Sequence, residues 1–172
     1  MRSLFGGRRR SVFGPGKELG VYRNELFTVT ERIDAILATV ADEIDALRRR
    51  DLDPDEAAQR LGAHEEALDV EEETLQGMMA PEELHGLHME YEANLERALR
   101  GIVTAVRGCS ITRLPHRPPD DEEPFIYYKR GQLNVTHARL RMAEIVDVLI
   151  HWEPGKPAEA TVAARMERQR EA

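Results

Sequence analysis

The sequence predicts an all-α protein, an antiparallel bundle of three to four long, coiled-coil-like helices. Two observations predict this fold. The composition combines 41% hydrophobic and 33% charged residues with only 5% aromatic residues, which is typical of helical rather than strand-rich domains. Apolar residues also recur at spacings of three and four along several long segments, which places them on one helical face. At 172 residues, the chain can bury such a core as one domain without disulfides.

The strongest helical segment covers residues 19–50. Its apolar positions fall in one narrow stripe, formed by Tyr22, Leu26, Val29, Ile33, Ile36, Val40, Ile44 and Leu47. Most acidic residues of the segment lie off this stripe, as on a helix that contributes a seam to a bundle. Because the stripe cannot remain in water, we expect other helices to cover it. Three arginines, residues 48–50, suit the negative end of the helix dipole.

A second helix is predicted over residues 54–79. Asp53 can accept the first backbone N–H groups, and Pro54 fits the first helical position. The expected buried edge consists of Leu61, Leu68, Leu75 and Met79. The rest of the segment is mainly acidic, and a helix-turn-helix interpretation would direct these carboxylates at DNA phosphates. Nucleic acid is therefore not an expected partner.

A third helix is predicted over residues 81–108, starting at Pro81 and ending with Gly108 as a C-cap. One face carries Leu84, Leu87, Tyr91, Leu95, Ala98, Ile102, Ala105 and Cys109. Cys109 is the only cysteine, so the chain has no internal disulfide. We expect its thiol to be a small buried hydrophobe.

The last helix is predicted over residues 124–152, after a loop over 109–123. Its main stripe consists of Tyr128, Gly131, Val135, Ala138, Met142, Ile145, Leu149 and Trp152. Ile126, Leu133 and Leu140 form a second line on roughly the opposite side. A helix with two apolar lines is either central or shared between chains, so these three residues are the predicted oligomer contact. The loop is interpreted as a long crossover, with a partner-binding or anion-binding loop as the alternative.

Charge is distributed unevenly along the chain, whose net charge is −8. Residues 1–17 contain five bases and no acid, whereas residues 51–92 contain fourteen acids and one base. We interpret residues 1–18 as an irregular arm that docks on an acidic protein face, through Leu4, Phe5, Arg8, Arg9, Arg10, Val12 and Phe13. The alternatives are an anionic membrane surface, on which arginines and aromatics also dock, and a solvated terminus. Residues 153–172 are predicted to form a polar tail.

No run of apolar residues reaches the length of a membrane span, and no apolar segment follows the basic N-terminus as in a signal peptide. The expected location is the cytoplasm, with the surface of a membrane as the alternative if the arm binds lipid.

Metal binding is the third alternative considered, because ferritin-like bundles bind metal through Glu and Glu-x-x-His motifs. Glu82 and His85 have this spacing, with His88 close by. The second motif is missing, and we expect both histidines to face the flank of the bundle or solvent. These three residues are weak candidates, and no metal, cofactor or catalytic residue is predicted.

The sequence thus predicts a non-enzymatic helical scaffold or interaction protein, which forms a homo-oligomer or belongs to a larger assembly. Its domain is expected to comprise residues 19–152, between the arm and the tail.

Overall fold

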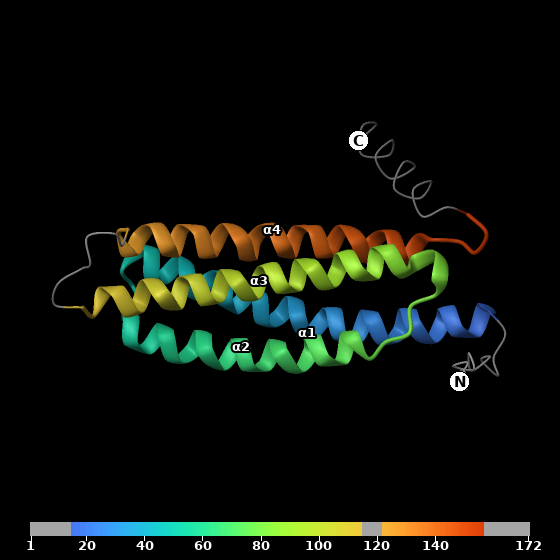
Figure 1. Ribbon diagram of the computed structural model, residues 1–172, viewed down its shortest axis with the longest axis horizontal. Helices are drawn as coiled ribbons and strands as arrows, with labels where there is room; N and C mark the ends of the chain where they lie inside the picture. The colour runs from blue at the N-terminus through green and yellow to red at the C-terminus, as the bar shows by residue number, and fades with distance from the viewer. Residues whose placement is uncertain (1–14, 115–121, 157–172) are drawn as a thin grey trace, which may run out of the picture.

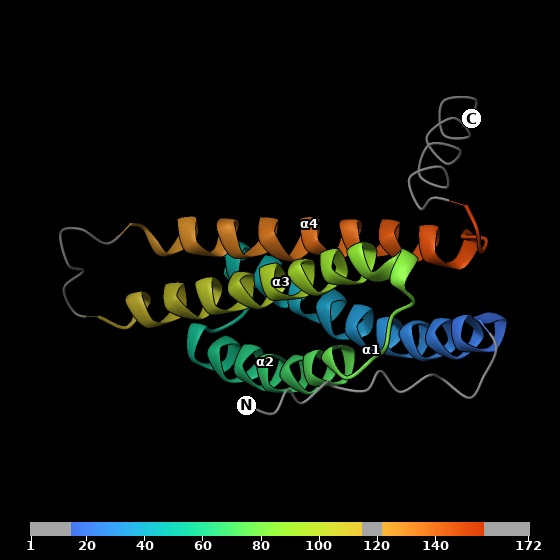
Figure 2. The same ribbon diagram turned by 45° about the vertical axis from the view of Figure 1, so that its right-hand side comes forward.

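The computed structural model describes residues 15–114 and 122–156, and these residues form an all-α bundle (Figure 1). The fold class predicted from the sequence is confirmed. The long helices are α1 (Pro15–Arg49), α2 (Pro54–Gln76), α3 (His85–Thr112) and α4 (Pro124–His151), and a short 3₁₀ turn, η1 (Glu82–Leu84), precedes α3. Each helix packs mainly against two neighbours, α1 against α2 and α4, and α3 against α2 and α4, so that α1 and α3 are diagonal (Figure 2).

The first two helices are joined by a tight turn with well-defined caps. Asp51 N donates to Ala46 O at 2.9 Å, and Arg50 has a positive φ of 63°, the left-handed conformation that often follows a helix. Asp53 then caps α2 as predicted, because its carboxylate accepts from the backbone N–H groups of Asp55 and Glu56 at 2.8 and 3.2 Å. The acidic first turn of α2 suits the positive end of its dipole.

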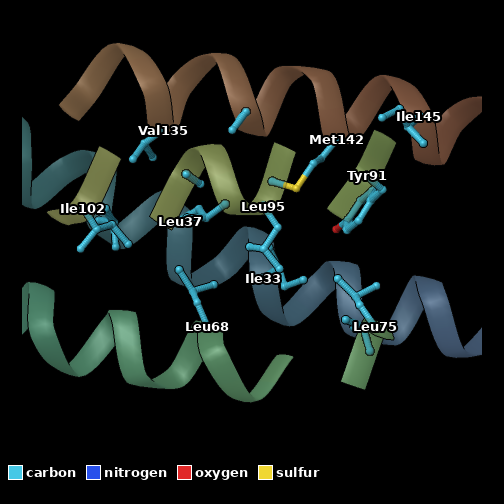
Figure 3. Close-up of a cluster of buried hydrophobic side chains, with 14 of the residues drawn as sticks. Ile33, Leu37, Leu68, Leu75, Tyr91, Leu95, Ile102, Val135, Met142 and Ile145 are labelled. Carbon is cyan, nitrogen blue, oxygen red and sulfur yellow. The ribbon is translucent and has the colours of Figure 1, made fainter. Parts of the chain in front are cut away.

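The core follows the predicted stripes with three exceptions, the first of which is Leu87 of α3, because it is only partly buried. Leu37 is fully buried where Ile36 was expected, and Ile36 is only partly buried. Met79 is 89% exposed, so its assignment to the buried edge of α2 was wrong. Because α2 ends at Gln76, Met79 lies beyond the helix, and helical spacing no longer directs its side chain toward the core. Figure 3 shows Leu68 and Leu75 of α2 pointing toward Ile33 of α1 and Leu95 of α3.

Helices α3 and α4 approach most closely at glycines. A Cβ on Gly101 would lie 2.9 Å from Gly131 O, and a Cβ on Gly131 would lie 2.7 Å from Gly101 O. Gly108 was wrongly predicted as a C-cap, because α3 continues to Thr112. It is needed instead for packing, since a Cβ there would lie 2.7 Å from the ring of Tyr128.

The first and last helices are joined by a long-range contact. Arg23 Nε donates to Leu149 O at 2.9 Å, and its Nη2 donates to Trp152 O. These carbonyls belong to the end of α4, where backbone acceptors have no partner within the helix. Arg23 therefore supplies hydrogen-bond donors to the end of α4, although it lies 126 positions before Leu149 in the chain.

Several boundaries differ from those expected, and α3 begins at His85, after η1, rather than at residue 81. Residues 15–18, which we assigned to the arm, are part of α1, and residues 109–112, which we assigned to the loop, are part of α3. Within the described ranges, no helix combines the length with the apolarity that crossing a membrane requires.

Candidate functional site

A buried polar group lies between the N-terminal parts of α1 and α3. Tyr22 Oη and His88 Nδ1 are 3.0 Å apart, and His88 Nε2 lies 3.4 Å from Glu92 Oε1. Because Nε2 faces a carboxylate, we assign the ring proton to Nε2 and let the Tyr22 hydroxyl donate to Nδ1. Burial, and then the Glu92 charge, raise the pKa of Tyr22. The phenol therefore stays protonated and remains a donor.

The position of His88 corrects the sequence interpretation. We expected His88 at the flank or in solvent, yet it is 4% exposed. The Tyr22 ring packs on it edge-to-face, with ring centroids 5.7 Å apart. The signal was present in the sequence, because Leu84, His88, Tyr91 and Leu95 follow one another at helical spacings of four, three and four. His88 is thus part of the buried stripe of α3.

The three weak metal candidates do not form a site together. Glu82 and His85 are exposed, whereas both ring nitrogens of the buried His88 face partners within the bundle. In residues 15–114 and 122–156, His, Cys, Asp and Glu side chains nowhere gather in a group of three that could hold a metal ion.

Four carboxylates converge on the side of the bundle formed by α2 and α3. Asp69 and Glu72 come from α2, and Glu92 and Glu96 come from α3. We call these four residues the acidic face. The pKa of Glu72 is raised by partial burial and by the charges of Glu96, Asp69 and Glu92. Repulsion among these groups therefore makes the ionised state of Glu72 less favourable.

At the acidic face, no ion pair joins α2 to α3 within the described residues, and its basic contacts lie within α3, where Arg100 binds Glu96 at 3.2 Å and His88 faces Glu92 at 3.4 Å. Arg32 binds Glu71 between α1 and α2 at 2.7 Å, Arg139 binds Asp34 between α4 and α1 at 2.9 Å, and Arg141 binds Glu90 between α4 and α3 at 2.7 Å. Among the described residues, α2 is joined to the C-terminal end of α3 by the ion pair between Asp55 and Arg113. That pair lies far along the helices from the acidic face, where Asp69 and Glu72 have no basic partner within the described ranges.

The outer side of α4 carries the predicted oligomer contact. Leu133 and Leu140 are 46% and 61% exposed, and Ile126 is half-buried. Their place on the surface agrees with a line of apolar residues outside the core, and the oligomer contact itself remains a prediction. Tyr128 of the main stripe is buried, and its hydroxyl lies 3.0 Å from Thr112 Oγ1.

The remaining predicted sites fall outside the described residues. These are the arm residues Leu4, Phe5, Arg8, Arg9, Arg10, Val12 and Phe13. Cys109 is buried as expected, and burial raises the pKa of its thiol.

Comparison of the chain with models of protein families, with curated protein sequences and with solved structures gives no match. Information on function therefore comes from the residues of the chain alone.

Proposed function

We propose that this chain is a non-enzymatic helical interaction protein, which self-associates or joins a larger assembly and uses its basic arm to dock on an acidic protein face. The observation that carries the proposal is the acidic face on α2 and α3. The pKa of Glu72 is raised by its partial burial and, in addition, by the charges of the other three carboxylates. An incoming cationic segment would relieve this repulsion.

The arm has the composition that such a surface would attract. Residues 1–17 hold five bases and no acid, and two pairs of apolar residues flank the three consecutive arginines. Arginine suits this role because its planar guanidinium binds carboxylates through two parallel hydrogen bonds. The apolar pairs add contact area, so that affinity would not depend on charge alone. The acidic face that receives the arm can belong to the same chain, to a second copy or to another protein.

The buried polar group supports a structural role for the interior. Tyr22, His88 and Glu92 satisfy one another across two helices, and His88 has no ring nitrogen left to contact a substrate. Buried polar contacts between two helices favour one pairing of these helices over others. The surfaces of the bundle are therefore the better candidates for its activity.

A peptide experiment tests the docking. A labelled peptide of residues 1–14 is titrated into a chain that begins at Pro15, the first residue of α1, and binding is followed by fluorescence anisotropy. We expect binding that weakens steeply as salt increases, because screening acts on exposed charges. The double variant Asp69→Asn/Glu72→Gln should weaken binding, whereas Glu73→Gln, an exposed carboxylate outside the acidic face, should leave it nearly unchanged.

Two results would contradict the proposal. The first is equal binding to the wild-type bundle and to the Asp69→Asn/Glu72→Gln variant. The second is a full chain whose native mass and co-purifying proteins are unaffected by removal of residues 1–14. Peptide binding to vesicles of anionic lipid, without binding to the bundle, would instead favour the membrane surface as the target of the arm.

A further inference from the structure

The outer side of α4 presents two exposed leucines within a regular pattern of charge. Leu133 and Leu140 lie seven residues apart, so they follow one another along the same line of the helix. Both lie opposite the buried positions of α4, such as Val135, Ala138 and Met142. Single exposed leucines are common on protein surfaces. The residues around this pair are what distinguish the surface.

Charged residues flank the two leucines at equal distances and with opposite signs. Lys129 lies four residues before Leu133, and Glu144 lies four residues after Leu140. Both are exposed, and this spacing keeps them near the line of the leucines. Arg141 binds both Glu144 and Glu90, at 2.8 and 2.7 Å, so that two carboxylates share one guanidinium and this end keeps a net negative charge. The outer surface of α4 is therefore basic toward its N-terminus, apolar in the middle and acidic toward its C-terminus. We call Lys129, Leu133, Leu140 and Glu144 the α4 dimer face.

A surface with this order of charges is complementary to a copy of itself turned end to end. In an antiparallel pairing centred between Thr136 and His137, Leu133 lies opposite the partner's Leu140, and Lys129 lies opposite the partner's Glu144. Two-fold symmetry makes each contact occur twice. A parallel pairing would place Lys129 near Lys129 and Glu144 near Glu144, which is unfavourable.

We propose that the α4 dimer face binds the same face of a second copy of this chain, antiparallel and about a two-fold axis that passes near Thr136 and His137. This inference rests on the proposed function, because it specifies how the protein self-associates. It assigns the contact to a surface away from the acidic face. Arm docking and dimer formation can therefore occur together.

The other available occupant fits this surface less well. Residues 1–17 of the arm carry only positive charge, so they would be repelled at the Lys129 end and attracted at the Glu144 end. A second copy matches both ends. Because the contact is one helix pair, its area falls at the small end of specific interfaces, which bury about 1,200–2,000 Å² in total. We therefore expect a dimer that dissociates on dilution.

The first experiment measures the mass of the full chain by sedimentation velocity over a range of concentrations. We expect a monomer–dimer equilibrium in the wild type. Leu140→Gln should weaken dimerisation by about tenfold or more, because it places an amide in the middle of the contact. Val70→Gln is the matched control, because Val70 on α2 is 61% exposed, the same fraction as Leu140. Thermal melts followed by circular dichroism verify that both variants remain folded.

The second experiment exchanges charges to test the antiparallel register. Lys129→Glu places carboxylates opposite each other at both ends of the contact, and Glu144→Lys does the same with ammonium groups. We expect each single variant to be more monomeric than the wild type and the double variant to dimerise again. Mixing the two single variants should yield a mixed dimer, detected by native mass spectrometry, because each end of the mixed contact then pairs a carboxylate from one chain with an ammonium group from the other.

Three outcomes would overturn different parts of the proposal. A wild type that stays monomeric at every concentration would overturn self-association, and with it the dimer. An oligomer whose mass is unchanged by Leu140→Gln and by both charge reversals would overturn the α4 dimer face but leave self-association standing. Single variants that weaken the dimer but do not combine on mixing would overturn the antiparallel register.

Discussion

The bundle holds α2 and α4 in place by different means. Helix α4 meets α3 through glycines, so that the two backbones nearly touch at Gly101 and Gly131. Helix α2 relies on large side chains, and Leu61, Leu68 and Leu75, seven residues apart, are fully buried. A close backbone contact depends on the absence of side-chain atoms, whereas a line of leucines depends on their presence. The same kind of substitution should therefore have opposite effects in the two regions.

The largest effect is expected where a leucine of α2 is shortened. Leu68→Ala should lower the free energy of unfolding by about 2–5 kcal/mol, because it removes buried apolar surface and leaves a cavity. Leu68 is 0% exposed and lies near the middle of α2. Urea unfolding followed by circular dichroism measures the change. A loss below that of an exposed control such as Val70→Ala would show that α2 contributes little to the core.

A smaller loss is expected where a side chain is added between α3 and α4. Gly131→Ala should destabilise the fold by about 1–3 kcal/mol, because the new methyl group meets the carbonyl of Gly101 and the helices must separate. The favourable helix propensity of alanine offsets only part of this cost. The melting temperature is the measurement, and an unchanged or higher value would contradict the close contact.

The matched substitution in α2 should have the opposite sign. A Cβ on Gly62 would meet no atom within 4 Å, so Gly62→Ala adds no clash. We expect a gain of about 0.5–1 kcal/mol, because alanine loses less conformational freedom than glycine in a helix. Urea unfolding followed by circular dichroism, with the wild type measured alongside, gives this change in the free energy of unfolding. If Gly62→Ala and Gly131→Ala change stability in the same direction, the contrast between the two regions is wrong.

The smallest effect is expected on the acidic face. Glu72→Gln should stabilise the fold at pH 7 by about 0.5 kcal/mol or less, because it removes a carboxylate that its neighbours repel. Folding raises the pKa of Glu72, so the folded state is stabilised relative to the unfolded state where Glu72 is protonated. This contribution to stability is lost as the pH rises through the raised pKa. The gain from the substitution should therefore shrink as pH falls toward 4. Glu73→Gln on the same helix is the control, and an equal gain from it would argue against the specific repulsion.

The sequence predicted the fold class well because helical periodicity depends on each helix alone. Three of the four buried residues of α2, and six of the ten buried residues of α3, were identified from spacing. Spacing also indicated that Leu133 and Leu140 lie away from the core of α4. The N-cap at Asp53 was predictable for the same reason, since its partners lie two and three residues away.

The errors concern features that depend on two helices at once. Gly108 was interpreted as a helix end because a glycine after a periodic segment is typical of one. Its actual role depends on the position of Tyr128 on α4, which no spacing within α3 reveals. The hydrogen-bond partner of His88 likewise lies on another helix, at Tyr22 of α1, although the burial of His88 could have been found from spacing within α3. The acidic face depends on which sides of α2 and α3 adjoin. Sequence periodicity therefore predicted the helices, but not the register between them.

The contact from Arg23 to the end of α4 has a consequence for synthesis of the protein. The residues that accept from Arg23 leave the ribosome long after α1, because 126 positions separate Arg23 from Leu149. Until then, the side of α1 that α4 will cover has no permanent neighbour, and transiently exposed apolar surface favours aggregation. The side of α1 that α4 covers therefore stays accessible to chaperones, and to other nascent chains, until α4 has been synthesised.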